Sequence, residues 1–100
     1  MSAADELARK IAAHLRAGEG TGAAWNIEIE EAREGYARIA MIVRADMLNG
    51  HKTCHGGMIF SLADTAFAYA CNSRNVETVA QTATISCLAP GREGDRLVAE

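Results

Sequence analysis

The sequence is poor in aromatic side chains and has no run of basic residues. Only 5% of its 100 residues are aromatic, so its core must be built from Leu, Ile, Val, Met and Ala. Ten Lys and Arg stand against 13 Asp and Glu, which gives a net charge of −3. A nucleic-acid-binding protein normally carries a basic patch or stripe, so this class of protein is disfavoured.

Long apolar runs are also lacking, which disfavours a membrane-bound protein. The most apolar stretch, residues 56–71, is divided by Asp64 into pieces of eight and seven residues. A membrane-spanning helix needs about 20 predominantly apolar residues. The acidic first residues lack the apolar segment of a secretory signal. Three cysteines in such a chain, Cys54, Cys71 and Cys87, favour reduced thiols and a cytoplasmic location.

The residues that are present predict a single domain that begins with a helix. One hundred residues can bury one modest core but not two. Leu7, Ile11 and Leu15 recur at helical spacing, and Ser2 can cap a helix over residues 3–17. The glycines within residues 18–22 are expected to end this helix, which is predicted to cover another element.

Alternating apolar and polar residues predict β-strands. Segments 25–30 and 36–44 have this period, and a turn over 31–35 would join them into an antiparallel hairpin. A long strand is predicted over 78–88, and another begins near 95–100.

Between these strands lies the most informative segment, residues 58–73. It contains no proline or glycine, and apolar residues surround most of its circumference, so we expect a buried central helix that the sheet wraps. The element order then predicts an α+β fold with a largely antiparallel sheet.

Asp64 is the strongest chemical candidate, because it is the one charged residue between Lys52 and Arg74. Ser61, Asp64, Thr65, Ala68 and Asn72 share one side of the predicted helix, and so form a narrow track of small and polar residues. A buried carboxylate there can serve as a general base or a nucleophile. The alternative is a structural aspartate that neighbouring donors hold, and the residues alone do not separate the two.

The segment before this helix offers a second candidate. Gly56 and Gly57 follow His55 at the helix start, where free backbone N–H groups can stabilise an oxyanion; a tight turn is the alternative. Asn49 precedes Gly50 and can either donate a hydrogen bond or simply form the turn. The spacing of His51, Cys54 and His55 lacks the further ligands of a zinc site, so no metal is predicted.

These motifs resemble a known family. Met47-Leu48-Asn49-Gly50-His51, Cys54-His55-Gly56-Gly57 and the stretch from Phe60 to Ser73 are similar to the phenylacetic acid degradation thioesterases of the hotdog superfamily of acyl-coenzyme A thioesterases. The close similarity spans residues 45–73. It implies a hotdog fold over residues 1–100, in which a curved antiparallel sheet wraps a long helix. Such proteins continue with further strands, so we expect strands beyond Glu100 to complete the sheet.

The resemblance also implies roles for individual residues. Asp64 matches the catalytic carboxylate, Gly56 the N–H that polarises the thioester carbonyl, and Asn49 and His55 the residues beside it. Asp64 is expected to come from one subunit, and the 49–57 loop from its neighbour. The expected substrate-binding residues are Gly57, Ser61, Thr65, Ala68, Gln81 and Thr82.

The implied function is hydrolysis of aryl- or phenylacetyl-coenzyme A thioesters without a metal or other cofactor, coenzyme A being part of the substrate. The implied assembly is a homodimer that pairs again into a homotetramer, without nucleic-acid or membrane partners. Two alternatives remain: a non-catalytic acyl-coenzyme A-binding domain, and a dehydratase on the same fold.

Overall fold

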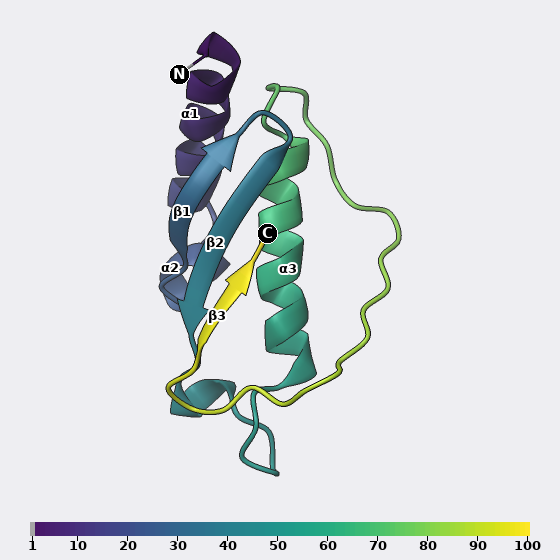
Figure 1. Cartoon of the computed structure of the whole chain (residues 1–100). Helices are drawn as coiled ribbons and strands as arrows, with labels where there is room; N and C mark the ends of the chain where they lie inside the picture. The colour runs from purple at the N-terminus through teal and green to yellow at the C-terminus, as the bar shows by residue number, and fades with distance from the viewer. Residues whose placement is uncertain (1) are drawn as a thin grey trace.

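The computed structural model describes residues 2–100, which form an α+β arrangement (Figure 1). The elements are, in order, α1 (Ala3–Gly18), α2 (Gly20–Ala24), β1 (Glu28–Arg33), β2 (Tyr36–Ile42), the 3₁₀ turn η1 (Ala45–Met47), α3 (Gly56–Cys71) and β3 (Arg96–Ala99). The predicted fold class is therefore confirmed.

The first helix begins at the predicted cap. The Oγ of Ser2 accepts a hydrogen bond from the Asp5 N–H at 3.1 Å. The helix ends at Gly18, as predicted, and residues 20–24 then form the short helix α2, which the sequence did not predict. A Cβ on Gly22 would lie 2.7 Å from Cδ of Arg16, so a larger residue there would displace this side chain, whose Nε donates to the Ile27 carbonyl.

The predicted antiparallel hairpin is confirmed. β1 pairs with β2, with Ile29 opposite Ile39, and the register shifts between Ile29 and Glu31. The prediction that residues 31–35 form the turn is wrong. β1 continues to Arg33, because residues 31–33 still pair with β2 after the shift in register. The chain reverses at residues 34–35, where Gly35 has a φ of 71° that glycine adopts without strain.

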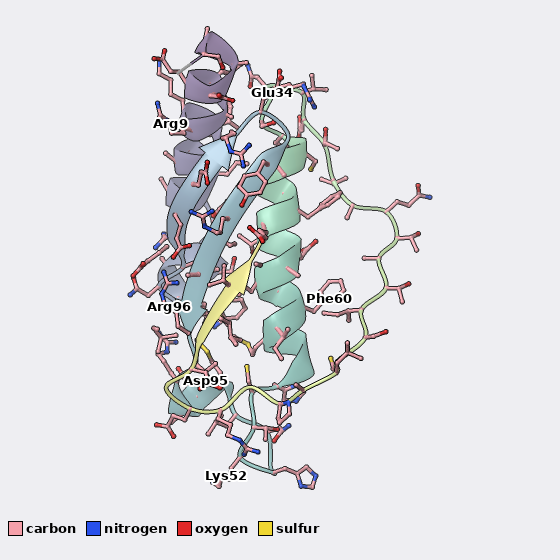
Figure 2. The ribbon with its side chains drawn as sticks, viewed as in Figure 1. Arg9, Glu34, Lys52, Phe60, Asp95 and Arg96 are labelled. Carbon is pink, nitrogen blue, oxygen red and sulfur yellow. The ribbon has the colours of Figure 1, made fainter. Side chains whose placement is uncertain are left out.

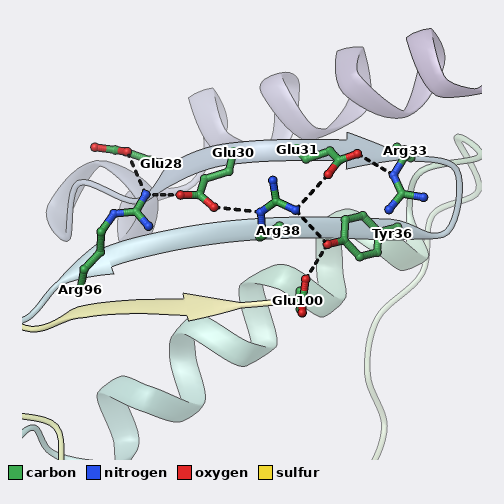
Figure 3. Close-up of polar contacts among 8 residues, drawn as sticks. All are labelled: Glu28, Glu30, Glu31, Arg33, Tyr36, Arg38, Arg96 and Glu100. Carbon is green, nitrogen blue, oxygen red and sulfur yellow. Dashed lines mark hydrogen bonds and ion pairs between the residues drawn. The ribbon is translucent and has the colours of Figure 1, made fainter. Parts of the chain in front are cut away.

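β3 extends the sheet on the far side of β2, as predicted for the last residues, and the strand order is β1-β2-β3. One face of this sheet carries a row of ion pairs in which Glu30 lies between Arg38 and Arg96 (Figure 3). The other face is apolar and is covered, so the alternating pattern in the sequence correctly separated the two faces.

α3 packs against β2 and also contacts β1, β3 and α1. The core lies between α3 and the sheet: Ile39, Met41 and Val43 are at most 1% exposed, and Tyr69 of α3 is buried among them. The hydroxyl of Tyr69 donates a hydrogen bond to the Glu19 carboxylate, and burial, followed by this bond, raises the pKa of the tyrosine.

Within residues 2–100 the sheet covers one side of α3, and the side that faces segment 76–90 is open. Phe67 is 48% exposed, and Asp64 is exposed on the same side of α3. Apolar composition around a helix predicts that it becomes covered, but it does not say whether the same chain provides the cover.

The predicted strand over 78–88 is also wrong. Residues 76–90 are exposed, and within residues 2–100 they join no sheet. They run along α3 on the side away from the sheet (Figure 1). Alternating β-branched residues favour an extended backbone, but a strand needs a paired neighbour to bond its N–H and C=O groups.

Within residues 2–100, no helix has both the length and the apolar character needed to cross a membrane.

Candidate active site

The loop before α3 is organised by Asn49. Its Oδ1 accepts hydrogen bonds from the N–H groups of His51 at 2.9 Å and Thr53 at 3.2 Å, while its Nδ2 lies 3.0 Å from Oγ1 of Thr53. A bridge between Leu48 and Cys54 closes the loop. The side chain of Asn49 thus forms the turn, which is one of the two roles that the sequence left open.

The first turn of α3 presents backbone N–H groups without acceptors. His55 caps the helix, and its carbonyl oxygen accepts from Met58 at 2.9 Å and from Ile59 at 3.3 Å. The N–H groups of Gly56 and Gly57 have no hydrogen-bond partner within residues 2–100. They stand at the positive end of the helix dipole, where a developing oxyanion is stabilised.

A hollow of about 320 Å³ lies in front of this turn, and we call it the loop hollow. Asn49 and Gly56 both line it, and Leu88 and Pro90 close it from segment 76–90. His55 is exposed beside this turn, with its N–H bound to the Met47 carbonyl at 2.8 Å. The structure therefore places three of the predicted residues together: Asn49, His55 and Gly56.

Asp64 lies at a second place on the same helix. It lines two adjoining hollows of about 160 and 240 Å³ between α3 and segment 76–90, which together we call the Asp64 hollow. Phe67 and Ala80 line both parts, and Phe60 projects toward segment 76–90 (Figure 2). Asp64 is the one charged residue in this lining.

The expectation that the Asp64 carboxylate is buried is wrong for the chain as described, because the side chain is exposed. Nor does one chain bring Asp64 to the loop hollow. Eight residues of helix separate it from Gly56, which corresponds to about 12 Å along the axis. The predicted catalytic residues therefore form two groups, each with its own hollow.

The expected substrate-binding residues divide in the same way. Ala68 and Thr82 line the Asp64 hollow, whereas Gln81, exposed on the same segment, is outside its lining. The hydroxyls of Ser61 and Thr65 each donate to the carbonyl one helical turn earlier, at 2.9 and 2.7 Å. Thr65 is 8% exposed, so its side chain faces the protein.

Two cysteines flank the loop hollow, a position that the sequence did not reveal. The Sγ of Cys87 lies 3.7 Å from the point that a Cβ on Gly56 would occupy. Burial raises the pKa of the Cys54 thiol, which keeps this group protonated and unreactive. No sequence spacing signals the place of Cys87, because it depends on the return of segment 76–90 along α3.

Within residues 2–100, no group of three or more His, Cys, Asp or Glu side chains lies close enough to hold a metal ion. The chemistry that these residues offer is that of a carboxylate and a pair of free backbone N–H groups. A carboxylate can activate water or attack a carbonyl carbon, and free N–H groups can stabilise the resulting oxyanion.

Comparison with known proteins identifies the family of this chain. Residues 51–100 match the thioesterase superfamily. The sequence is 57% identical over 76 residues to the acyl-coenzyme A thioesterase PaaI of Escherichia coli, in an alignment that covers 76% of this chain and 54% of that protein. The chain thus spans about half the length of this curated relative.

Solved structures show the same relationship. The Escherichia coli PaaI protein from the phenylacetic acid degradation operon superposes with a TM-score of 0.93 and 46% identity, over 96% of this chain and 70% of that one. A hypothetical thioesterase from Streptococcus pneumoniae, solved with coenzyme A, has a TM-score of 0.70 and 30% identity, over 73% of this chain and 57% of that one.

Two findings establish the family. The thioesterase superfamily matches half of the chain, and the solved PaaI structure is 46% identical to it over 70% of that structure's length. The chain belongs to the thioesterase superfamily, with the hotdog fold, and within it to the PaaI-type proteins.

Proposed function

We propose that this protein is an acyl-coenzyme A thioesterase that hydrolyses aryl- or phenylacetyl-coenzyme A-type thioesters. The observation that carries the proposal is that α3 presents both groups the reaction needs. Its first turn has the free Gly56 N–H, and two turns later Asp64 stands in an otherwise uncharged hollow. The coenzyme A-bound relative supports the substrate class.

In the proposed reaction, Asp64 takes a proton from a water molecule, whose oxygen attacks the thioester carbonyl carbon. The Gly56 N–H donates a hydrogen bond to the oxyanion that forms. The carbon–sulfur bond then breaks, and the leaving thiolate of coenzyme A takes up the proton that Asp64 gained, which restores the carboxylate. In the alternative course, the Asp64 carboxylate attacks the carbonyl carbon, the carbon–sulfur bond breaks and the coenzyme A thiolate leaves. Water then hydrolyses the resulting mixed anhydride, which releases the acid and restores the Asp64 carboxylate.

The separation of the two groups along α3 supports a site shared between subunits. Because Asp64 and Gly56 line different hollows of one chain, we propose that Asp64 of one subunit faces the 49–57 loop of its neighbour in a homodimer, which pairs again into a homotetramer. Such an arrangement also covers the exposed Asp64 and Phe67. Residues 1–100 then act as part of one hotdog domain, and the three free thiols suit a cytoplasmic location.

Asn49 and His55 are proposed to orient the carbonyl or the water molecule, and Gly57 to assist Gly56. Ala68 and Thr82, which line the Asp64 hollow, are proposed to contact the acyl group. Ser61, Thr65 and Gln81 remain predicted substrate-binding residues. Their present contacts do not place them in that lining.

A panel of thioesters tests the proposal. The release of free thiol is measured with phenylacetyl-, hydroxyphenylacetyl-, acetyl- and palmitoyl-coenzyme A, and binding of each is measured by calorimetry. We expect the highest kcat/KM for the two aryl substrates. Binding of the thioesters without hydrolysis of any would contradict the proposal and favour a non-catalytic acyl-coenzyme A-binding domain.

A further inference from the structure

The C-terminal end of α3 carries a side chain that the proposed mechanism does not use. Asn72 follows the last residue of the helix, and its carboxamide bonds both backbone groups of Thr78. Its Oδ1 accepts from the Thr78 N–H at 2.8 Å, and its Nδ2 donates to the Thr78 carbonyl at 2.9 Å. One side chain thus pairs with residue 78 as a neighbouring strand would.

The same carboxamide is fixed to the helix. Its Nδ2 also donates to the Ala68 carbonyl at 2.8 Å, one turn earlier, so both N–H bonds of the amide have acceptors. The backbone of Asn72 completes the corner: its carbonyl accepts from Asn75 at 2.9 Å, where the chain turns through a φ of 61°. Thr78 is therefore attached at a defined position along the α3 axis, beside the C-terminal end of the helix.

Within the described residues, Asn72 supplies the first hydrogen-bonded attachment of segment 76–90 to α3. Within residues 2–100, residues 79–90 neither donate nor accept a hydrogen bond, and the segment is held again only where the Gly91 carbonyl accepts from Cys54 at 2.7 Å. The 16-residue helix is about 24 Å long. The 14 residues from Thr78 to Gly91 can reach about 45 Å, so chain length alone does not fix the position of the segment along α3.

The residues that Asn72 holds are those that face Asp64. Thr78 and Ala80 line one part of the Asp64 hollow, and Ala80 and Thr82 line the other. The point at which Thr78 is attached to α3 therefore sets the positions of Ala80 and Thr82 along the helix. We propose that Asn72 is a positioning residue that fixes segment 76–90 against α3 and so shapes the hollow around Asp64. This inference rests on the proposed function for its catalytic consequence.

The chemistry of the side chain makes the inference specific. Replacement of Asn72 by Asp keeps an acceptor for the Thr78 N–H but removes both donors, and sets a carboxylate against the carbonyls of Thr78 and Ala68. Replacement by Ala removes all three bonds. Asn75→Asp is a matched control, because it makes the same amide-to-carboxylate change three residues away. The backbone N–H of residue 75, which donates to the Asn72 carbonyl, is kept.

The experiment measures amide hydrogen exchange and kinetics in the same four proteins: wild type, Asn72→Ala, Asn72→Asp and Asn75→Asp. We expect the Thr78 amide to exchange about tenfold faster in Asn72→Ala, less than that in Asn72→Asp, which keeps an acceptor, and at the wild-type rate in Asn75→Asp. We also expect kcat on the best thioester to fall about tenfold, with KM changed much less, because the hollow at the reacting centre is misplaced.

Wild-type kcat and KM in Asn72→Ala would overturn the inference. It would equally be overturned if exchange rose uniformly over the whole chain, because Asn72 would then act only on global stability. If the wild type hydrolyses no thioester while only the amides near Thr78 exchange faster, the attachment stands, and it is the proposed function that fails.

Discussion

The Oγ of Ser73 accepts a hydrogen bond from the N–H of Gly35 at 2.8 Å, and this bond joins the end of α3 to the turn between β1 and β2. Ser73 is 1% exposed, whereas Gly35 lies in an exposed turn, so the bond connects the buried end of α3 to the surface of the sheet. The Gly35 N–H lies at the point where the hairpin reverses with a positive φ. The bond thus fixes the position of the C-terminal end of α3 relative to the sheet.

We expect Ser73→Ala to lower the free energy of unfolding by about 1–2 kcal/mol, because the Gly35 N–H loses its acceptor. Denaturant unfolding of wild type and variant measures this change. Ser61→Ala is the control, since its hydroxyl only adds a bond within α3, and we expect it to change the stability by less than about 0.5 kcal/mol. Equal effects of the two substitutions would show that the Ser73 bond has no special structural role.

The row of ion pairs on the outer face of the sheet predicts a pH dependence. Hydrogen bonds from Arg96, and then from Arg38, hold the pKa of Glu30 below its ordinary value of 4.5 (Figure 3). A carboxylate with a lowered folded-state pKa stabilises the fold above its unfolded-state value, and this contribution is lost as the pH falls through the lower folded-state value.

Glu30→Gln should therefore lower the Tm at pH 7, and the difference from wild type should shrink toward pH 2 as the Glu30 carboxylate becomes protonated. The exposed Glu93 provides a control, since Glu93→Gln should leave the Tm nearly unchanged at both pH values. A difference that persists at low pH would mean that the charge of Glu30 does not stabilise the sheet.

The proposal of a shared site predicts that two inactive variants restore each other. Asp64→Asn removes the base, and Asn49→Asp removes the amide donor while keeping the acceptor for the His51 and Thr53 N–H groups. When equal amounts are unfolded and refolded together, half of the dimers are mixed, and one of the two sites in each carries neither change. About a quarter of the wild-type activity should return. If no activity returns although mixed dimers form, the site lies within one subunit.

The sequence predicted the parts of the fold that one chain can satisfy locally. The Ser2 cap, the alternation along β2 and the apolar composition of α3 each depend on neighbours a few residues away, and all three elements formed where they were expected. For residues 78–88, where the presence of a pairing partner decides the outcome, the pattern was insufficient. The period of residues 78–88 favours an extended chain, but a strand also needs a neighbour, and within residues 2–100 none pairs with it.

The candidate site followed the same rule. The motif from Asn49 to Gly57 correctly placed a turn and a helix start beside each other, because these features are local. It could not reveal that Cys87 lies against Gly56, or that Asn72 bonds Thr78, because both contacts depend on the return of segment 76–90 along α3. Nor could apolar neighbours in the sequence bury Asp64, since that requires a covering surface on its side of the helix.

The most direct test of the proposed mechanism is the kcat of Asp64→Asn on the best thioester of the panel, measured beside its thermal unfolding. Because Asp64 is exposed in the single chain, the substitution should leave the fold intact, and the Tm serves as the control. We expect kcat to fall by about 10³-fold, as for the loss of a general base, while the affinity for substrate is kept. A variant that retains the wild-type kcat would show that Asp64 neither activates water nor attacks the thioester.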